Sequence, residues 1–148
     1  MPYCIFYTPK LNNIASYSQS GRIKRLLPAI VWAIIIFVLS IISGNRLPKI
    51  DLGWIQPDKV GHFGVYFIFS VLLYYGLSPL FSKEKKVALL AIIISALYGI
   101  AMEIIQFLFF PGRFFEYLDI IANISGSIGS LIVINYFFKA GSEKRMSN

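Results

Sequence analysis

The stretch VALLAIIISALYGIAMEIIQFLFF, residues 87–110, decides the fold of this protein. It runs for 24 residues and contains one charged side chain, that of Glu103. An α-helix rises ~1.5 Å per residue, so about 20 apolar residues are needed to cross the ~30 Å hydrocarbon core of a bilayer. The alternation of apolar and polar residues that marks a barrel strand is absent. The segment is therefore predicted to be a membrane-spanning helix.

Three further apolar runs, at residues 26–42, 60–81 and 118–138, have 17, 22 and 21 residues. The first is at the short end of the range for a membrane span, and the others are comfortably long. Backbone polar groups in lipid must be satisfied within the segment, which requires helices. The predicted fold is all-α, an integral membrane bundle of four transmembrane helices over residues 26–138. A basic arm, residues 1–25, precedes it, and a short tail, residues 139–148, follows.

The composition excludes other classes of protein. Of the 148 residues, 57% are hydrophobic and only 14% are charged, whereas an ordinary soluble domain carries about 25% charged residues. High hydrophobicity excludes a disordered chain, and the length excludes a large multidomain enzyme. The single cysteine, Cys4, excludes an internal disulfide and any multi-cysteine metal site.

The distribution of basic residues predicts the orientation. Ten of the 14 Lys and Arg residues lie in the arm, the 82–86 loop and the tail, and four lie in the other two loops. The positive-inside rule then places both termini in the cytoplasm and the other two loops outside. The net charge of +7 is thus an orientation signal, and no nucleic-acid partner is expected. The arm and first apolar run also fit a signal peptide ending near Ser43, although a retained signal-anchor has the same pattern.

The strongly polar residues of the last three spans gather at one membrane level, the predicted outer end. Seven of them flank or enter the apolar runs there, and one lies in the connecting loop. The seven are Asp58, Lys59, His62, Glu103, Gln106, Asp119 and Asn123, and the loop residue is Arg113. Spacings of three or four residues put the members of each span on one helix face. The inner halves of the same helices contain almost no such residues. This level is therefore the predicted functional site.

Glu103 is the least ordinary of these residues, because it lies roughly 10 Å inside its run by the helical rise. A charge at that depth is costly and must face protein or water and a partner, for which Lys59 and Arg113 are available. Small residues every four positions allow helix backbones to approach closely. They occur at Ala91, Ser95 and Gly99 in the third span and at Ala122, Gly126 and Ser130 in the fourth. The third and fourth spans are thus predicted to be neighbours, with Glu103 and Asn123 near their interface.

The ordered set of polar motifs resembles the VanZ-like family. The motifs are Asp58-Lys59-x-x-His62-Phe63, Glu103-x-x-Gln106, Pro111-Gly112-Arg113 and Asp119-x-x-x-Asn123-x-x-Gly126-x-x-Gly129. The resemblance implies a small bacterial protein of the cytoplasmic membrane. It also implies a link to the cell envelope and to glycopeptide antibiotics, because the founding member is linked to teicoplanin resistance. The family supplies no mechanism, and Glu116 adds a carboxylate outside its pattern.

Several chemical roles are open for the predicted site. His62 and Glu103 are the candidate acid and base. Candidate substrate-binding residues are Asp58, Lys59, Gln106, Arg113, Asp119 and Asn123. The expected partner is a membrane lipid or a lipid-linked cell-wall precursor, and Lys59 and Arg113 would hold its phosphate or carboxylate. A divalent metal on Asp58, His62, Glu103 and Asp119 is compatible with this set but not required.

Each residue also has a purely structural interpretation. Asp58 and Asp119 are expected at the starts of helices, where they would act as caps or interact with the helix dipole. Lys59 would extend to lipid headgroups, and Arg113 would bind lipid phosphate. The alternative to a functional site is therefore a membrane scaffold without catalytic activity, in which the polar cluster holds three helices in register.

Overall fold

The computed structural model describes residues 21–42, 57–81, 83–110 and 115–136, and all regular structure in these residues is helical. The elements are α2 (Leu27–Ile42), α3 (Pro57–Leu77), the short 3-10 helix η1 (Ser78–Leu80), α4 (Glu84–Phe109) and α5 (Tyr117–Gly129). After a turn at Ser130, helix continues to Tyr136. Four helical segments are long and apolar enough to cross a membrane: Gly21–Ile41, Pro57–Leu80, Glu84–Phe109 and Tyr117–Tyr136. The predicted all-α bundle of four spans is confirmed.

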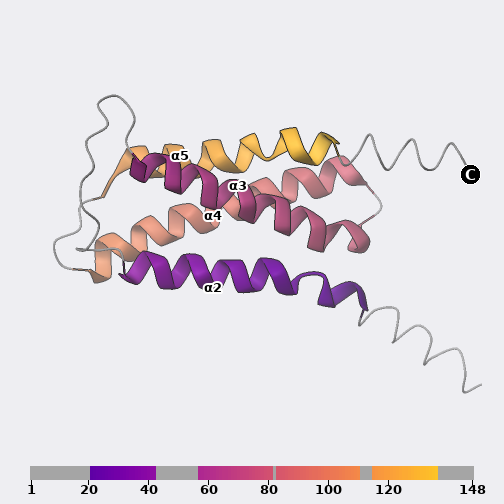
Figure 1. The fold of residues 1–148 in the computed structure, drawn as a ribbon, viewed down its shortest axis with the longest axis horizontal. Coiled ribbons are helices and arrows are strands. Elements are labelled where there is room, and N and C mark those ends of the chain that lie inside the picture. Colours follow the sequence, from indigo (N-terminus) through magenta and orange to yellow (C-terminus); the bar gives the residue numbers. More distant parts are fainter. Residues whose placement is uncertain (1–20, 43–56, 82, 111–114, 137–148) are drawn as a thin grey trace, which may run out of the picture.

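The helices run up and down alternately, and α3, α4 and α5 pack against one another (Figure 1). Helix α2 lies on one side of this group, against α3 and α4. Three hydrogen bonds from side chains to backbone carbonyls attach it. Trp32 Nε1 on α2 donates to Val65 O on α3, and from α4 Tyr98 OH donates to Ala33 O and Gln106 Nε2 to Ser40 O. Large apolar side chains cover the outside of the bundle, as expected for a surface in contact with lipid.

The interior of the bundle is partly polar. An apolar core includes Tyr66, Phe69 and Met102. Beside it, buried serines join the helices: Ser95 Oγ lies 2.8 Å from Ser127 Oγ, and Ser130 Oγ donates to Ser70 Oγ at 2.9 Å. Hydroxyl bonds of this kind hold membrane helices together where apolar burial gives little driving force.

The small residues of α4 and α5 lie at helix contacts, but not all at the contact that the sequence suggests. Ala91, Ser95, Gly99 and Glu103 form one buried face of α4, and a Cβ on Gly99 would be 2.9 Å from Asn123 Cβ on α5. The prediction that these helices are neighbours is therefore correct. The closest approach of α5, however, is to α3, where a Cβ on Gly126 would lie 2.2 Å from Phe63 O.

The orientation of the bundle and the assigned boundaries of the arm and tail stay predictions. Residues 1–20 and 137–148 lie outside the described part of the chain, as do Ser43 and Arg113.

Candidate functional site

The first turns of α3 and α5 meet at the end of the bundle where α4 finishes (Figure 1). Pro57 begins α3, where the missing N–H of proline costs no helical hydrogen bond. Asp58 and Lys59 follow in the same turn, and His62 lies one turn further on. On α5, Asp119 is in the first turn and Asn123 in the second. Glu103 reaches the same level from the last turns of α4.

Lys59 forms the ionic centre of this end. Its Nζ donates to Asp119 Oδ1, lies 2.5 Å from Glu116 Oε2 and lies 3.4 Å from Asp58 Oδ2. The Lys59 and Asp119 side chains are only 18% and 9% exposed, so this pair is largely removed from water. Lys59 therefore joins α3 to the start of α5, in contacts that a lysine extended toward lipid headgroups would not make.

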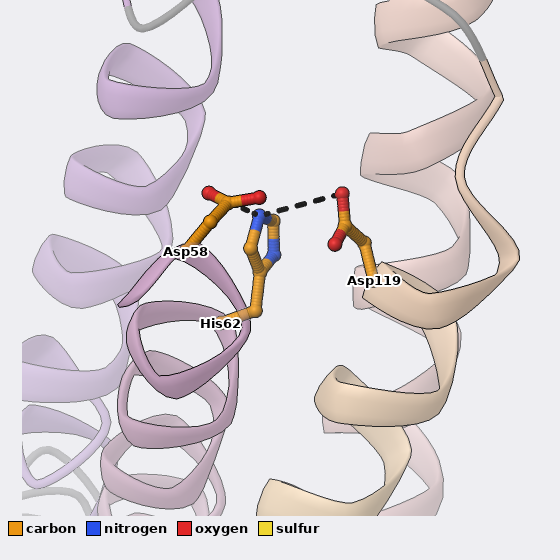
Figure 2. Close-up of side chains that lie close together, drawn as sticks. All are labelled: Asp58, His62 and Asp119. Atoms are coloured by element: carbon orange, nitrogen blue, oxygen red, sulfur yellow. Dashed lines mark ion pairs between the residues drawn. The ribbon is translucent and has the colours of Figure 1, made fainter. Parts of the chain in front are cut away.

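Each ring nitrogen of His62 has at least one carboxylate nearby. Nε2 is 3.7 Å from Asp58 Oδ1 and 3.8 Å from Asp119 Oδ2, and Figure 2 shows the imidazole standing between these two aspartates. Nδ1 is 3.0 Å from Asn123 Oδ1 and 3.8 Å from Glu103 Oε1. The imidazole therefore has a carboxylate or amide oxygen near each of its two ring nitrogens.

The site is layered by depth. Asp58 and Glu116 are at the surface, with side chains 60% and 55% exposed, whereas Glu103 is 4% exposed and Asn123 is fully buried. Asn123 Nδ2 has no hydrogen-bond partner among the described residues. Leaving a buried donor unpaired costs about 1–3 kcal/mol. The amide of Asn123 therefore lowers the stability of the fold by its unpaired nitrogen, while its oxygen contacts His62.

Six of the eight predicted site residues come together in this cluster: Asp58, Lys59, His62, Glu103, Asp119 and Asn123. The amide nitrogen of Gln106 instead donates to Ser40 O on α2, so Gln106 ties α4 to α2. Arg113 lies outside the described residues. The roles assigned to all eight stay predictions.

Glu116 is the residue that the sequence reasoning left out of the site. It is the N-cap residue of α5, where its side chain makes no capping bond, and its carboxylate binds Lys59 instead. The available signal was its position three residues before Asp119, just outside an apolar run. Asp119 also does more than interact with the helix dipole, because its two oxygens face Lys59 and His62.

These features define a class of protein: a small all-helical membrane bundle with an acid-rich polar cluster enclosed at one end by three of its four spans. Comparison with known families is more specific. Residues 3–138 match the VanZ/LLP1 family, and the chain belongs to it. No curated protein and no solved structure gave a significant match.

Proposed function

We propose that this polar cluster binds and acts on a cell-envelope molecule held in the membrane, either an anionic envelope lipid or a lipid-linked peptidoglycan precursor. One observation carries the proposal: the titratable His62 is placed between carboxylates at the end of a bundle whose outer surface is apolar. A lipid-linked molecule would lie beside such a surface, with its polar head at the level of the cluster. We further propose that the cluster faces outward in a bacterial cytoplasmic membrane.

His62 and Glu103 are the proposed acid and base. Glu103 Oε1 and His62 Nδ1 are 3.8 Å apart, and Glu103 is almost fully buried. Intramembrane acids are costly, and those that persist commonly serve proton transfer or ligand binding. Asn123 orients the imidazole through the contact at Nδ1. The pair therefore has one buried acid and one oriented imidazole, which is the minimum for acid–base chemistry.

The charge balance restricts how an anionic molecule would bind. The described cluster contains four carboxylates, those of Asp58, Glu103, Glu116 and Asp119, and a single ammonium group, that of Lys59. Lys59 already contacts three of these carboxylates. The phosphate or carboxylate of the bound molecule would therefore depend on Arg113 or on an added cation. The carboxylates of Asp58 and Asp119 would bind its hydroxyl or amide groups.

Membership of the VanZ/LLP1 family supports an effect on glycopeptide susceptibility. Glycopeptides bind peptidoglycan precursors, so a protein that binds or alters those precursors would change how much antibiotic binds to them. An effect of this chain on teicoplanin susceptibility is accordingly part of the proposal.

A membrane scaffold is the second candidate, and the contacts of Lys59 favour it. This one side chain joins the first turns of α3 and α5, and the buried serines hold the same helices further along. A cluster that only fixes helix register needs no particular chemistry at His62 or Glu103, and this is the point at which the two candidates differ.

The test is to express the chain in a teicoplanin-susceptible bacterium and to compare wild type with His62→Gln and Glu103→Gln. Readouts are the teicoplanin inhibitory concentration and the pool of lipid-linked precursors. Glu84→Gln, at the opposite end of α4, is the matched control. We expect both site variants to insert at the wild-type level yet to lose the effect, while Glu84→Gln retains it. Full effect in both site variants would establish the scaffold instead.

The purified protein separates an enzyme from a binding module. Detergent-solubilised wild type and His62→Gln are incubated with a polyprenyl-linked peptidoglycan precursor, and both retention and conversion of the precursor are measured. Conversion by wild type and retention without conversion by the variant would identify an enzyme. Retention without conversion by wild type would identify a binding module. If wild type neither retains nor converts the precursor, the proposed action on this substrate has no support.

A further inference from the structure

The oxygens of Asp58 and Asp119 are divided between two neighbours. One oxygen of each faces Lys59 Nζ: Asp119 Oδ1 accepts its hydrogen bond, and Asp58 Oδ2 is 3.4 Å away. The other oxygen of each faces His62 Nε2, Asp58 Oδ1 at 3.7 Å and Asp119 Oδ2 at 3.8 Å. Lys59 thus neutralises one side of the pair of aspartates and leaves the other side to the imidazole.

We propose that Asp58 Oδ1, His62 Nε2 and Asp119 Oδ2 bind one divalent cation that accepts both imidazole and carboxylate ligands, Zn²⁺ or Mn²⁺. The ligand atoms of these three residues lie within 4.8 Å of one another, and Figure 2 shows them converging from α3 and α5. Donors around a tetrahedral ion with bonds of about 2.0–2.1 Å are about 3.3 Å apart. The donors therefore need to close by about 0.4–0.5 Å at the two His62 pairs. The two aspartate oxygens lie within 4.8 Å of each other and need to close by at most about 1.5 Å.

The other nitrogen of His62 supports the assignment independently. Nδ1 is 3.0 Å from Asn123 Oδ1. A carbonyl oxygen only accepts, so the tautomer that satisfies this contact has its proton on Nδ1 and its Nε2 lone pair toward the two aspartates. At 3.7 and 3.8 Å neither aspartate hydrogen-bonds to Nε2. A histidine in which one ring nitrogen donates to an oxygen while the other faces anionic donors has the usual arrangement of a metal ligand.

Asn123 strengthens this point. It is fully buried, and its Nδ2 finds no partner in the described ranges 21–42, 57–81, 83–110 and 115–136. The chain therefore keeps a costly amide whose oxygen fixes the tautomer of His62. This is the role that the oxygen partner of a metal-binding histidine performs.

The charge of the cluster also favours a cation. In the described part of the chain, the carboxylates of Asp58, Glu116 and Asp119 lie around Lys59, and its one ammonium group does not balance all three. A divalent cation would offset two of the remaining charges in a partly buried place, where uncompensated charge is expensive. Asp58 is 60% exposed, so an ion has access from the end of the bundle. A protonated His62 is the competing arrangement, and it predicts no retained metal.

The inference concerns the site of the proposed function but does not require its substrate, because the readout is bound metal. Binding of the cation would replace the acid–base role proposed above for His62 with that of a ligand, and Glu103 alone would keep the acid–base role.

The experiment uses the full chain, purified in detergent with a tag that contains no histidine. Protein treated with EDTA is equilibrated with Zn²⁺ or Mn²⁺, unbound metal is removed by size exclusion, and the metal content is measured by mass spectrometry. We expect about one ion per chain in wild type, in line with a three-ligand site. Asp119→Asn and His62→Gln should retain almost none. Glu116→Gln should retain the wild-type amount, because its carboxylate contacts Lys59 and is not one of the three donors.

Two further measurements guard against misfolded variants. Circular dichroism and the size-exclusion profile establish that each variant is folded. The visible absorption of protein loaded with Co²⁺ then reports the ligands directly, and it should change in His62→Gln even where some metal remains. No retained Zn²⁺ or Mn²⁺ in wild type would overturn the proposal, as would an equal loss in Glu116→Gln, which indicates general attraction to acidic residues. Metal retention without any teicoplanin effect would remove the proposed function alone.

Discussion

Lys59 and His62 share the same two aspartates yet have different tasks. Lys59 closes the contact between α3 and α5, and most of its side chain is buried with Asp119. His62 uses the remaining oxygens, and it also touches Asn123 and approaches Glu103. Structural and chemical functions therefore meet at these aspartates, so single substitutions there would mix the two. Residues that touch only Lys59 or only His62 give cleaner tests.

Asn123 touches His62 but not Lys59, so we expect Asn123→Ala to impair the site more than the fold. Losing the oxygen that fixes the imidazole should weaken retention of Zn²⁺ or Mn²⁺ by about 10–100-fold. The free energy of unfolding should fall by no more than about 1 kcal/mol, because an unpaired buried donor is removed as well. Metal titration and denaturation in detergent measure the two effects. Asn135→Ala, an exposed position beyond α5, is the control and should change neither.

Lys59→Met should have the opposite profile. Removing the ammonium leaves Asp119, which is 9% exposed, and Glu116 without their shared partner. We expect a loss of about 2–4 kcal/mol of stability, below the full cost of breaking a wholly buried pair because Glu116 is exposed. Added Zn²⁺ should restore part of the lost stability, since the cation would neutralise Asp119 together with Asp58. Unchanged stability in detergent denaturation would show that the ion pairs do not join α3 to α5.

The sequence predicts at which membrane level the site lies better than it predicts where each side chain of the site points. Periodicity places Glu103 and Gln106 on one side of their helix, yet residues three apart still differ in direction by about 60° around an α-helix. That difference is enough for Glu103 to face His62 while the amide nitrogen of Gln106 faces Ser40 on α2. Glu116 is outside every apolar run, and its contact with Lys59 depends on how closely α5 approaches α3. Such an approach is set by tertiary packing.

At the scale of the helices, Gly126 determines how closely α5 approaches α3. A Cβ there would lie 2.2 Å from Phe63 O and 2.9 Å from Phe63 C, both backbone atoms that cannot turn aside. The spacing of small residues identifies a face suited to close packing but not the helix that packs on it. For this reason the four spans follow from hydropathy, whereas the α3–α5 contact needs the structure.

Gly126→Ala should therefore separate α3 from α5. Overpacking typically costs about 1–3 kcal/mol, and we expect the free energy of unfolding to fall by an amount at or above the upper end of this range. Metal retention should also weaken, because the donors come from both helices. Gly64→Ala is the matched control on α3, where an added Cβ would meet nothing within 4 Å. It should be neutral or slightly stabilising, as alanine favours helix over glycine. Equal stability of the two variants in thermal unfolding would contradict the close contact.

For the whole molecule, the two ends of the bundle differ in charge, and this difference predicts its orientation. The polar cluster lies where α3 and α5 begin, and the starts of α2 and α4 are at the other end (Figure 1). The described residues at that other end include six exposed cations: Arg22, Lys24, Arg25, Lys83, Lys85 and Lys86. Arg25 packs over the Tyr75 ring, which places the start of the first span beside the end of α3. Basic residues at a span terminus favour the cytoplasmic side.

Thiol labelling tests this orientation, using a chain in which Cys4 is first replaced by serine. Tyr117 is 74% exposed at the start of α5, and Lys85 is exposed at the start of α4, so the two positions report opposite ends of the bundle. A membrane-impermeant maleimide added to intact cells should label Tyr117→Cys, whereas Lys85→Cys should react only after permeabilisation. The reverse pattern would put the cluster in the cytoplasm, where lipid-linked precursors are assembled before export and glycopeptides do not reach. The site would then have to act on the precursor before it crosses the membrane, so this experiment decides which form of the envelope molecule can be its substrate.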